Sequence, residues 1–159
     1  GLGNEQKFEN SPTFAIGSYG DSLINITNAY SSVNNNGVFI KPSILEKIEL
    51  SNGNTVWSNK HQSKRIIQNE ISNKFNLLLE KSVSEGNGTA ASISGEKIYG
   101  KTGTSDMNRD IWFIGSLKNI TSGIWIGFDD NKPSNLSSGN AAYIWKLYMK
   151  RINFRELKN

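Results

Sequence analysis

The residues with the most evident chemistry are Lys101-Thr102-Gly103-Thr104, referred to below as the Lys-Thr-Gly-Thr segment. The segment offers one cation, two hydroxyl groups and a glycine beside which a ligand can approach backbone N–H groups. These groups together are suited to binding a carboxylate and stabilising an oxyanion. The plainer interpretation is a lysine at the start of a strand with a turn nearby, because a motif of four residues depends on its context.

Composition restricts the other kinds of chemistry. The chain has 159 residues, no cysteine and one histidine, His61. This length fits one domain with its own core. A metal site of thiolate or imidazole ligands has nothing to be made from, and a Ser-His-Asp triad would need His61, which lies in the polar loop-like run 58–65. We therefore expect neither a metal nor a cofactor.

The charge pattern argues against a nucleic-acid partner. The formal net charge is +4, but the basic residues are spread out and the aromatic residues occupy apolar positions. A nucleic-acid surface would need a basic stripe interleaved with stacking aromatics. No apolar run approaches the roughly 20 residues of a membrane span, and the N-terminus lacks the pattern of a signal peptide. An export signal or membrane anchor would therefore have to lie upstream of this chain.

The first half of the chain predicts a loop, a helix and a hairpin. Residues 1–20 read as a loop with a turn or short strand at 14–16. Leu23, Ile26, Tyr30 and Val33 recur at helical spacing after Ser22, which can cap the helix, and Gly37 can end it. After Lys41-Pro42, the run 44–57 predicts a hairpin around an Asn-Gly turn at 52–53, which we expect to form a surface flap.

The second half predicts a helix, three strands and a closing helix. The helix spans 69–84, and its predicted inner face is Ile71, Phe75, Leu78, Leu79 and Val83. The Lys-Thr-Gly-Thr strand is followed by apolar runs at 111–117 and 121–128, which favour an antiparallel meander. The closing helix is predicted at 140–152, and its predicted inner face is Ala141, Trp145, Tyr148, Met149 and Ile152. This order predicts an α+β fold in which the meander is covered on both faces.

Several residues near the strands have alternative interpretations. The aromatic residues of the meander are expected in the sheet core rather than in substrate stacking: Trp112, Phe113, Trp125 and Phe128. Asp110 and Asp129 suit turns or caps as well as a site, and Arg109 is by default an exposed turn residue.

Several motifs in a fixed order along the chain indicate a resemblance to a known family. The Lys-Thr-Gly-Thr segment is followed by Asp110-x-Trp112-Phe113-x-Gly115 and by the run 125–129, and it is preceded by matching segments at 17–22, 28–30, 36–38, 41–42 and 85–90. In this the chain resembles the transpeptidase domain of bifunctional (class A) penicillin-binding proteins. The resemblance covers nearly all of residues 1–159 and implies the C-terminal portion of a penicillin-binding/β-lactamase-like transpeptidase fold.

Two motifs of that family are not matched in this chain. Family members attack with the serine of a Ser-x-x-Lys motif at a helix start, helped by a Ser-x-Asn motif, and both precede Lys-Thr-Gly. The one Ser-x-x-Lys here is Ser94 to Lys97, which contains a glycine and lies directly before the strand; Ser-x-Asn occurs at 32–34 and 138–140, out of place. We interpret all three as coincidences. The nucleophile and the general base are expected outside this chain.

The resemblance assigns roles within the Lys-Thr-Gly-Thr segment. Lys101 and Thr104 would be catalytic: Lys101 would place positive charge beside the serine pair, and the Thr104 N–H would be half of the oxyanion hole. Thr102, Gly103 and Thr104 would bind substrate. The two hydroxyls would meet the terminal carboxylate of the peptide or of a β-lactam, and Gly103 would keep the strand edge open to an added strand.

The function that the resemblance implies is peptidoglycan cross-linking by serine acyl transfer from D-Ala-D-Ala stem peptides, with β-lactams as inhibitors. It also implies a periplasmic, membrane-anchored protein with an upstream glycosyltransferase domain. We expect this chain alone to be inactive and to expose apolar surface toward the missing N-terminal part or an oligomer partner. The alternative is a catalytically silent module that binds cell-wall peptide or a protein partner; a carboxypeptidase or β-lactamase is a third reading.

Overall fold

The computed structural model describes residues 12, 17 and 20–152. Its helices are α1 (Leu23–Asn34), α2 (Asn69–Ser84) and α3 (Ser138–Arg151), with short 3₁₀ turns η2 (Thr89–Ala91) and η3 (Asp106–Asn108). Its strands are β1 (Val38–Ile40), β2 (Lys47–Glu49), β3 (Thr55–Ser58), β4 (Ser63–Arg65), β5 (Ile98–Thr104), β6 (Asp110–Leu117) and β7 (Ile120–Gly127). The turn or strand expected at 14–16 lies outside the described residues.

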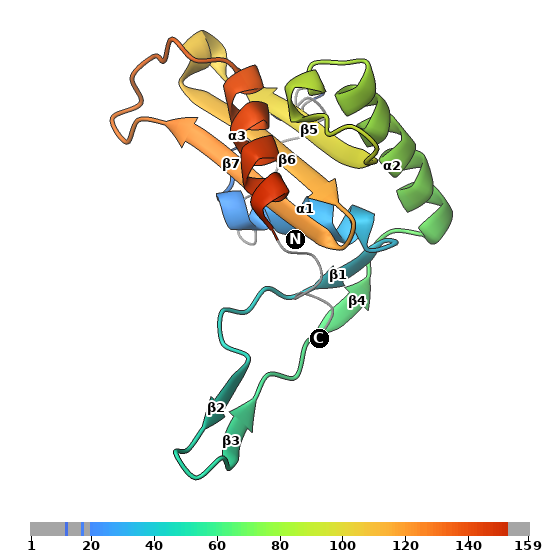
Figure 1. Cartoon of the computed structure of the whole chain (residues 1–159), viewed down its shortest axis with the longest axis vertical. Helices are drawn as coiled ribbons and strands as arrows, with labels where there is room; N and C mark the ends of the chain where they lie inside the picture. Colours follow the sequence, from blue (N-terminus) through green and yellow to red (C-terminus); the bar gives the residue numbers. More distant parts are fainter. Residues whose placement is uncertain (1–11, 13–16, 18–19, 153–159) are drawn as a thin grey trace.

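Strands β5, β6 and β7 form the antiparallel meander that the sequence predicts (Figure 1). Thr104 of β5 lies opposite Ile111 of β6, and the pairing continues without a break to Ile98 opposite Leu117. This uninterrupted register keeps successive side chains on alternating faces of the sheet. The α+β fold class is confirmed.

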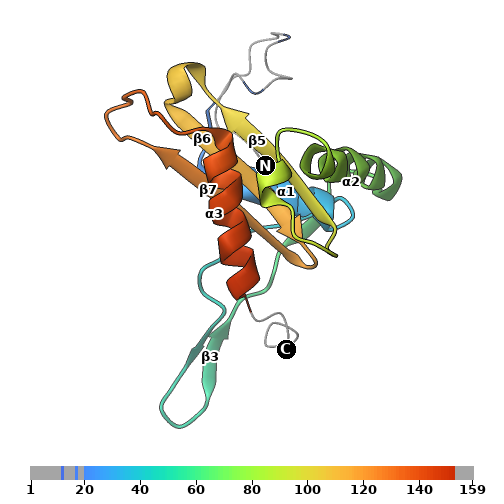
Figure 2. The ribbon, with the colours of Figure 1, turned by 45° about the horizontal axis from the view of Figure 1, so that its top comes forward.

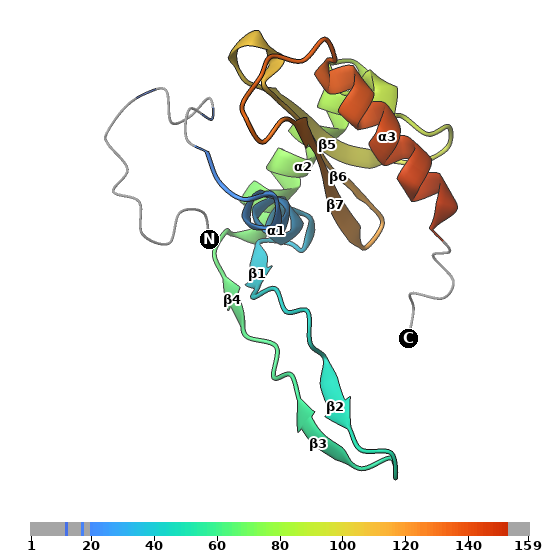
Figure 3. The ribbon, with the colours of Figure 1, turned by 90° about the vertical axis from the view of Figure 1, so that its left-hand side faces the viewer.

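Helices cover both faces of this sheet (Figures 1 and 3). On one face the Ser122 hydroxyl lies 3.6 Å from the Met149 sulfur of α3. On the other face a Cβ added to Gly123 would lie 2.4 Å from the Thr27 hydroxyl oxygen of α1. Figure 2 shows α3 running across the strands and α2 beside β5. The prediction that each face of the meander is covered is therefore confirmed.

The core between the sheet and α3 is centred on two aromatic rings. Trp145 and Phe113 are fully buried, and their ring centroids are 5.3 Å apart in an edge-to-face arrangement. Glycines on the neighbouring strands make room for them: a Cβ on Gly100 would lie 2.6 Å from Phe113, and one on Gly115 would lie 2.8 Å from Trp145. Larger residues at these two positions would force the helix away from the sheet.

Helix α1 begins and ends as its sequence indicates. The Ser22 hydroxyl accepts a hydrogen bond from the Asn25 N–H at 3.3 Å. Gly37 follows the helix with a φ of +81°, and a Cβ there would lie 2.1 Å from the Ile67 carbonyl oxygen. Only glycine fits such a position. Burial of Tyr30 within this helix raises the pKa of its phenol above the ordinary value.

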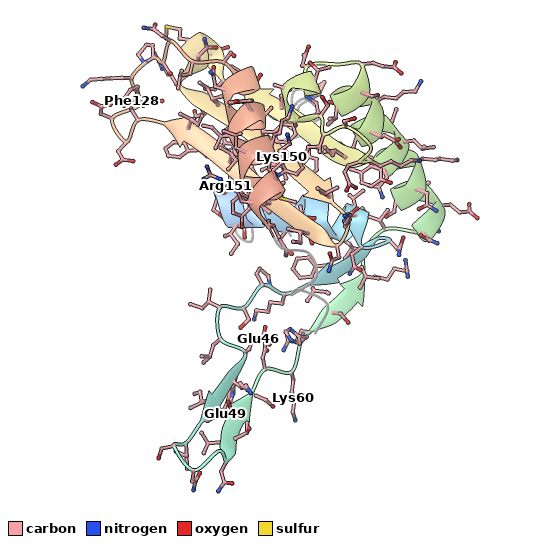
Figure 4. The ribbon with its side chains drawn as sticks, in the orientation of Figure 1. Glu46, Glu49, Lys60, Phe128, Lys150 and Arg151 are labelled. Atoms are coloured by element: carbon pink, nitrogen blue, oxygen red, sulfur yellow. The ribbon has the colours of Figure 1, made fainter. Side chains whose placement is uncertain are left out.

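Two small antiparallel pairs extend from α1. Strands β2 and β3 form the predicted hairpin, which projects from the body of the molecule (Figures 1 and 3). Its base is a second pair, β1 with β4, which sequence patterning did not predict. Figure 4 shows Glu46, Glu49 and Lys60 along this projecting arm.

None of the helices in the described residues combines the length and hydrophobicity that crossing a bilayer requires.

Some predictions of core positions were wrong, on α2 and among the aromatic residues. Helix α2 forms over the predicted residues, but it buries Ser72, Leu79 and Val83. Three of its predicted inner residues are exposed, namely Ile71, Phe75 and Leu78. Leu79 and Val83 of the predicted face are buried, but the stripe that packs passes through Ser72 rather than through Ile71, Phe75 and Leu78, which lie on the neighbouring stripe of the helix. Apolar surface on α2 is thus left uncovered in the described part of the chain, in line with the expectation of exposed apolar surface.

The remaining errors concern aromatic residues. Phe128, expected in the core, is 54% exposed because it follows the end of β7 (Figure 4). Tyr148 is 51% exposed on the outer side of α3, while Trp145 and Met149 on the inner side are buried as predicted. Trp125 of β7, also expected in the core, is exposed as well.

We predict that Trp145→Ala lowers the free energy of unfolding by about 3–5 kcal/mol, because it empties the space between α3 and the sheet. Tyr143→Ala, an exposed position on the same helix, should cost less than about 1 kcal/mol. Chemical denaturation of the purified variants measures both. Equal losses for the two variants would contradict the packing described here.

Candidate active site

The Lys-Thr-Gly-Thr segment occupies the end of an edge strand. Strand β5 pairs with β6 and, within the described residues, with no other strand. Its second edge therefore carries backbone N–H and C=O groups that no strand satisfies. Such an edge is where an extended peptide can add as a further strand.

The phase of the ladder decides which groups face that open edge. The Ser105 N–H donates to the Asp110 carbonyl at 3.0 Å, so these two residues form a hydrogen-bonded pair. Hydrogen-bonded and non-bonded pairs alternate in an antiparallel ladder, so Gly103 and Lys101 also bond to β6. Thr102 and Thr104 fall between them and direct their N–H and C=O groups outward.

The side chains of the segment divide between the two faces of the sheet. Lys101 is exposed, and its Nζ donates to the Thr102 carbonyl oxygen at 2.8 Å, at the open edge. Thr104 is exposed as well, whereas Thr102 is only 8% exposed. The structure thus brings an ammonium group, an outward N–H and one accessible hydroxyl to the same end of β5. Of the two threonine hydroxyls, that of Thr104 is the accessible one.

A hydrogen-bond network follows the segment directly. The Ser105 hydroxyl accepts from the Asp110 N–H at 2.8 Å and donates to the Asp110 carboxylate Oδ2 at 3.0 Å. The other carboxylate oxygen, Oδ1, accepts from the Trp125 indole N–H at 3.0 Å. Asp110 is therefore neither a simple turn residue nor a helix cap. The sequence signal for this network is the spacing of Ser105 and Asp110 around a hairpin loop, to which the sequence analysis above assigned no role.

Two glycines shape the surface beside the network. A Cβ on Gly103 would lie 3.2 Å from the Trp112 Cβ, and one on Gly127 would lie 2.5 Å from the Trp125 ring. The Trp112 and Trp125 rings are 6.4 Å apart and tilted at 56°. This pair forms a partly exposed aromatic surface next to the segment, so the expected sheet-core position is wrong for Trp125, while Trp112 is half-buried.

The other serine motifs lie where the sequence interpretation expected them. Ser94 lies in a turn with Gly95 at a φ of +80°, and exposed Lys97 forms an ion pair with Glu80 at 3.8 Å. Neither residue opens a helix. The run 138–140 begins α3, where the Asn140 side chain completes a capping box with Ser137.

A groove elsewhere in the described residues does not involve the Lys-Thr-Gly-Thr segment. A groove of about 460 Å³ between α1 and β7 is lined mainly by apolar and hydroxyl-bearing residues and includes Pro42 and Gly123, but no residue of the Lys-Thr-Gly-Thr segment. No three His, Cys, Asp or Glu side chains gather in the described residues so as to hold a metal ion.

Comparison with known proteins agrees with this fold. Residues 1–144 match the family model of the penicillin-binding protein transpeptidase domain. The chain is 30% identical over 152 residues to penicillin-binding protein 1B of Haemophilus influenzae, covering 92% of this chain and 19% of that protein. It is 31% identical over 138 residues to penicillin-binding protein 1A of Clostridium tetani, covering 82% of this chain and 18% of that protein.

Solved structures show the same fold. Penicillin-binding protein 1A from Haemophilus influenzae superposes with a TM-score of 0.81 and 20% identity, over 99% of this chain and 29% of that chain. The D,D-transpeptidase domain of a peptidoglycan glycosyltransferase from Eggerthella lenta gives a TM-score of 0.72 with 21% identity, over 86% of this chain and 33% of that chain.

The fold and the match to the family model together identify the class of domain to which this chain belongs. It belongs to the penicillin-binding protein transpeptidase domain family, and its relatives include class A penicillin-binding proteins 1A and 1B. The chain spans about a fifth of the length of the curated relatives it matches.

We predict that Lys101→Met changes the free energy of unfolding by less than about 1 kcal/mol. The Nζ hydrogen bond joins adjacent residues of one strand, so its loss separates no elements. The denaturation midpoint measures the effect. A loss as large as that of a core truncation would mean that Lys101 is structural, which would contradict its placement as an available site group.

Proposed function

We propose that this chain supplies the Lys-Thr-Gly-Thr wall of the active site in a serine D,D-transpeptidase that cross-links peptidoglycan. The observation that carries the proposal is the open edge of β5, where the Thr104 N–H points outward beside the Lys101 ammonium group. An acyl donor that adds along this edge would place its carbonyl oxygen against the Thr104 N–H.

In this proposal Thr104 provides half of an oxyanion hole. A backbone N–H is held in position by its strand, so it needs no reorganisation when charge develops on the carbonyl oxygen. The second half would be the N–H of the nucleophilic serine, which the upstream part of the domain supplies. Gly103, which carries no side chain, leaves the strand surface open to the bound peptide.

Lys101 would hold positive charge close to the attacking serine and to the anionic end of the peptide. Its Nζ already lies at the open edge, 2.8 Å from the Thr102 carbonyl oxygen. The hydroxyl of Thr104 would donate to the terminal carboxylate of the stem peptide or of a β-lactam. Thr102 would contribute to the edge chiefly through its outward carbonyl, because its side chain is nearly buried.

The remaining parts of the reaction lie outside this chain in the proposal. The serine nucleophile and its general base come from an upstream segment, as do membrane anchoring, a glycosyltransferase domain and delivery to the periplasmic face of the inner membrane. The exposed apolar stripe of α2 is a surface suited to packing against that segment. The 159-residue chain by itself is then unable to form an acyl-enzyme.

The test is covalent labelling of the natural full-length protein with a fluorescent penicillin. We expect labelling at a serine upstream of Gly1 and at least about 100-fold slower labelling in Lys101→Met, since removing a group that assists proton transfer typically costs 10²–10⁴-fold. Lys150→Met, an exposed change on α3 that also removes one positive charge, is the matched control and should label at the normal rate (Figure 4).

Other outcomes would overturn the proposal. A label on Ser94 or on any other serine of this chain would place the nucleophile here. Binding of a D-Ala-D-Ala peptide by the full-length protein without covalent labelling would support the silent binding module instead. Equal labelling of wild type and Lys101→Met would remove Lys101 from the mechanism.

A further inference from the structure

The Asp110 carboxylate joins the loop after the Lys-Thr-Gly-Thr segment to strand β7. Asp110 accepts hydrogen bonds from the Ser105 hydroxyl with one oxygen and from the Trp125 indole with the other, at 3.0 Å each. Ser105 directly follows β5 and Trp125 lies on β7, and β5 and β7 are the two outer strands of the sheet. The carboxylate therefore links the first residue after the site strand to the opposite outer strand.

Three hydrogen bonds join Ser105 to Asp110. Its N–H donates to the Asp110 carbonyl, its hydroxyl accepts from the Asp110 N–H, and that hydroxyl donates to the carboxylate. Because Ser105 directly follows Thr104, these bonds set the direction in which the chain leaves the outward Thr104 N–H.

The loop between them needs such support. Met107 and Asn108 both have φ values in the left-handed region, +57° and +53°, which non-glycine residues adopt at a cost. The Asn108 carbonyl accepts one further bond, from the Ser134 N–H at 3.2 Å. Met107 is largely exposed beside the site.

The site geometry also explains Gly127. It lies opposite Asp110 in the β6–β7 ladder, and a Cβ there would lie 2.5 Å from the Trp125 ring. The absence of a side chain lets the Trp125 ring lie across the strand, where its N–H meets the Asp110 carboxylate.

We infer that Asp110 is a positioning residue for the transpeptidase site: through Ser105 and Trp125 it holds the end of β5, and with it the Thr104 N–H, at the place where the oxyanion forms. This inference rests on the proposed function. Displacing a reacting contact by about 1 Å can lower the reaction rate 10²-fold. We therefore expect that removing the Asp110 carboxylate slows acylation even in protein that is fully folded.

The test uses the natural full-length protein and fluorescent penicillin, with the acylation rate constant at saturation measured separately from the half-saturating concentration. Asp110→Ala should acylate about 10- to 100-fold more slowly in the folded fraction, with a smaller change in half-saturation. Asp110→Asn should recover most of the rate, because its oxygen can accept from Trp125 and its NH₂ can donate to Ser105.

Trp125→Phe keeps an aromatic ring but removes the indole N–H and its hydrogen bond to Asp110, so it should lower the rate by an intermediate factor. Adding it to Asp110→Ala should cause little further loss, since both changes break the same link. Glu49→Gln, which removes a carboxylate from the distant β2–β3 hairpin, is the control and should leave the rate unchanged (Figure 4).

The outcomes separate the two proposals. A wild-type protein that is not acylated would overturn the proposed function and this inference with it. An acylated wild type with unchanged rate constants in folded Asp110→Ala and in Trp125→Phe would overturn the inference alone. If Asp110→Ala does not fold, the other two variants provide the test. A normal acylation rate in Trp125→Phe would contradict the positioning role. An acylation rate in Asp110→Asn no faster than that of Trp125→Phe would contradict it too.

Discussion

The hydrogen-bond phase between β5 and β6 is the constraint on which the candidate site depends. Because Ser105 and Asp110 form a bonded pair, Thr102 and Thr104 direct their backbone groups to the open edge. A shift of one residue would turn the Thr104 N–H into the sheet and leave Gly103 at the edge instead. The Lys-Thr-Gly-Thr segment can present the Thr104 N–H to a ligand at the open edge only in this register.

The register is maintained from both ends of the strand pair. At the buried end, Phe113 and Trp145 fill the space that Gly100 and Gly115 leave, so a slipped strand would place side chains against these rings. At the site end, Asp110 closes the hairpin by polar contacts that remain partly exposed to solvent. Apolar packing thus fixes the sheet as a whole, while a few oriented hydrogen bonds fix its last residues.

Sequence patterns predicted the elements better than their orientation. Helical spacing located all three helices and short apolar runs located the meander, because these signals are local. The inward face of α2 was misassigned, since Ile71, Phe75 and Leu78 satisfy the same period as the stripe that packs. The Asp110 network was not predicted either: it depends on Trp125, fifteen residues away, reaching across Gly127. The motif supplied the candidate site residues, but it could not indicate which threonine hydroxyl is accessible.

The most direct test of this account is the structure of the full-length protein after acylation by a penicillin. The account predicts an ester carbonyl oxygen within hydrogen-bond distance of the Thr104 N–H, the antibiotic's amide side chain running along the open edge of β5, and its carboxylate beside the Thr104 hydroxyl and Lys101. An acyl group bound away from β5, or a Thr104 N–H engaged within the sheet, would contradict it.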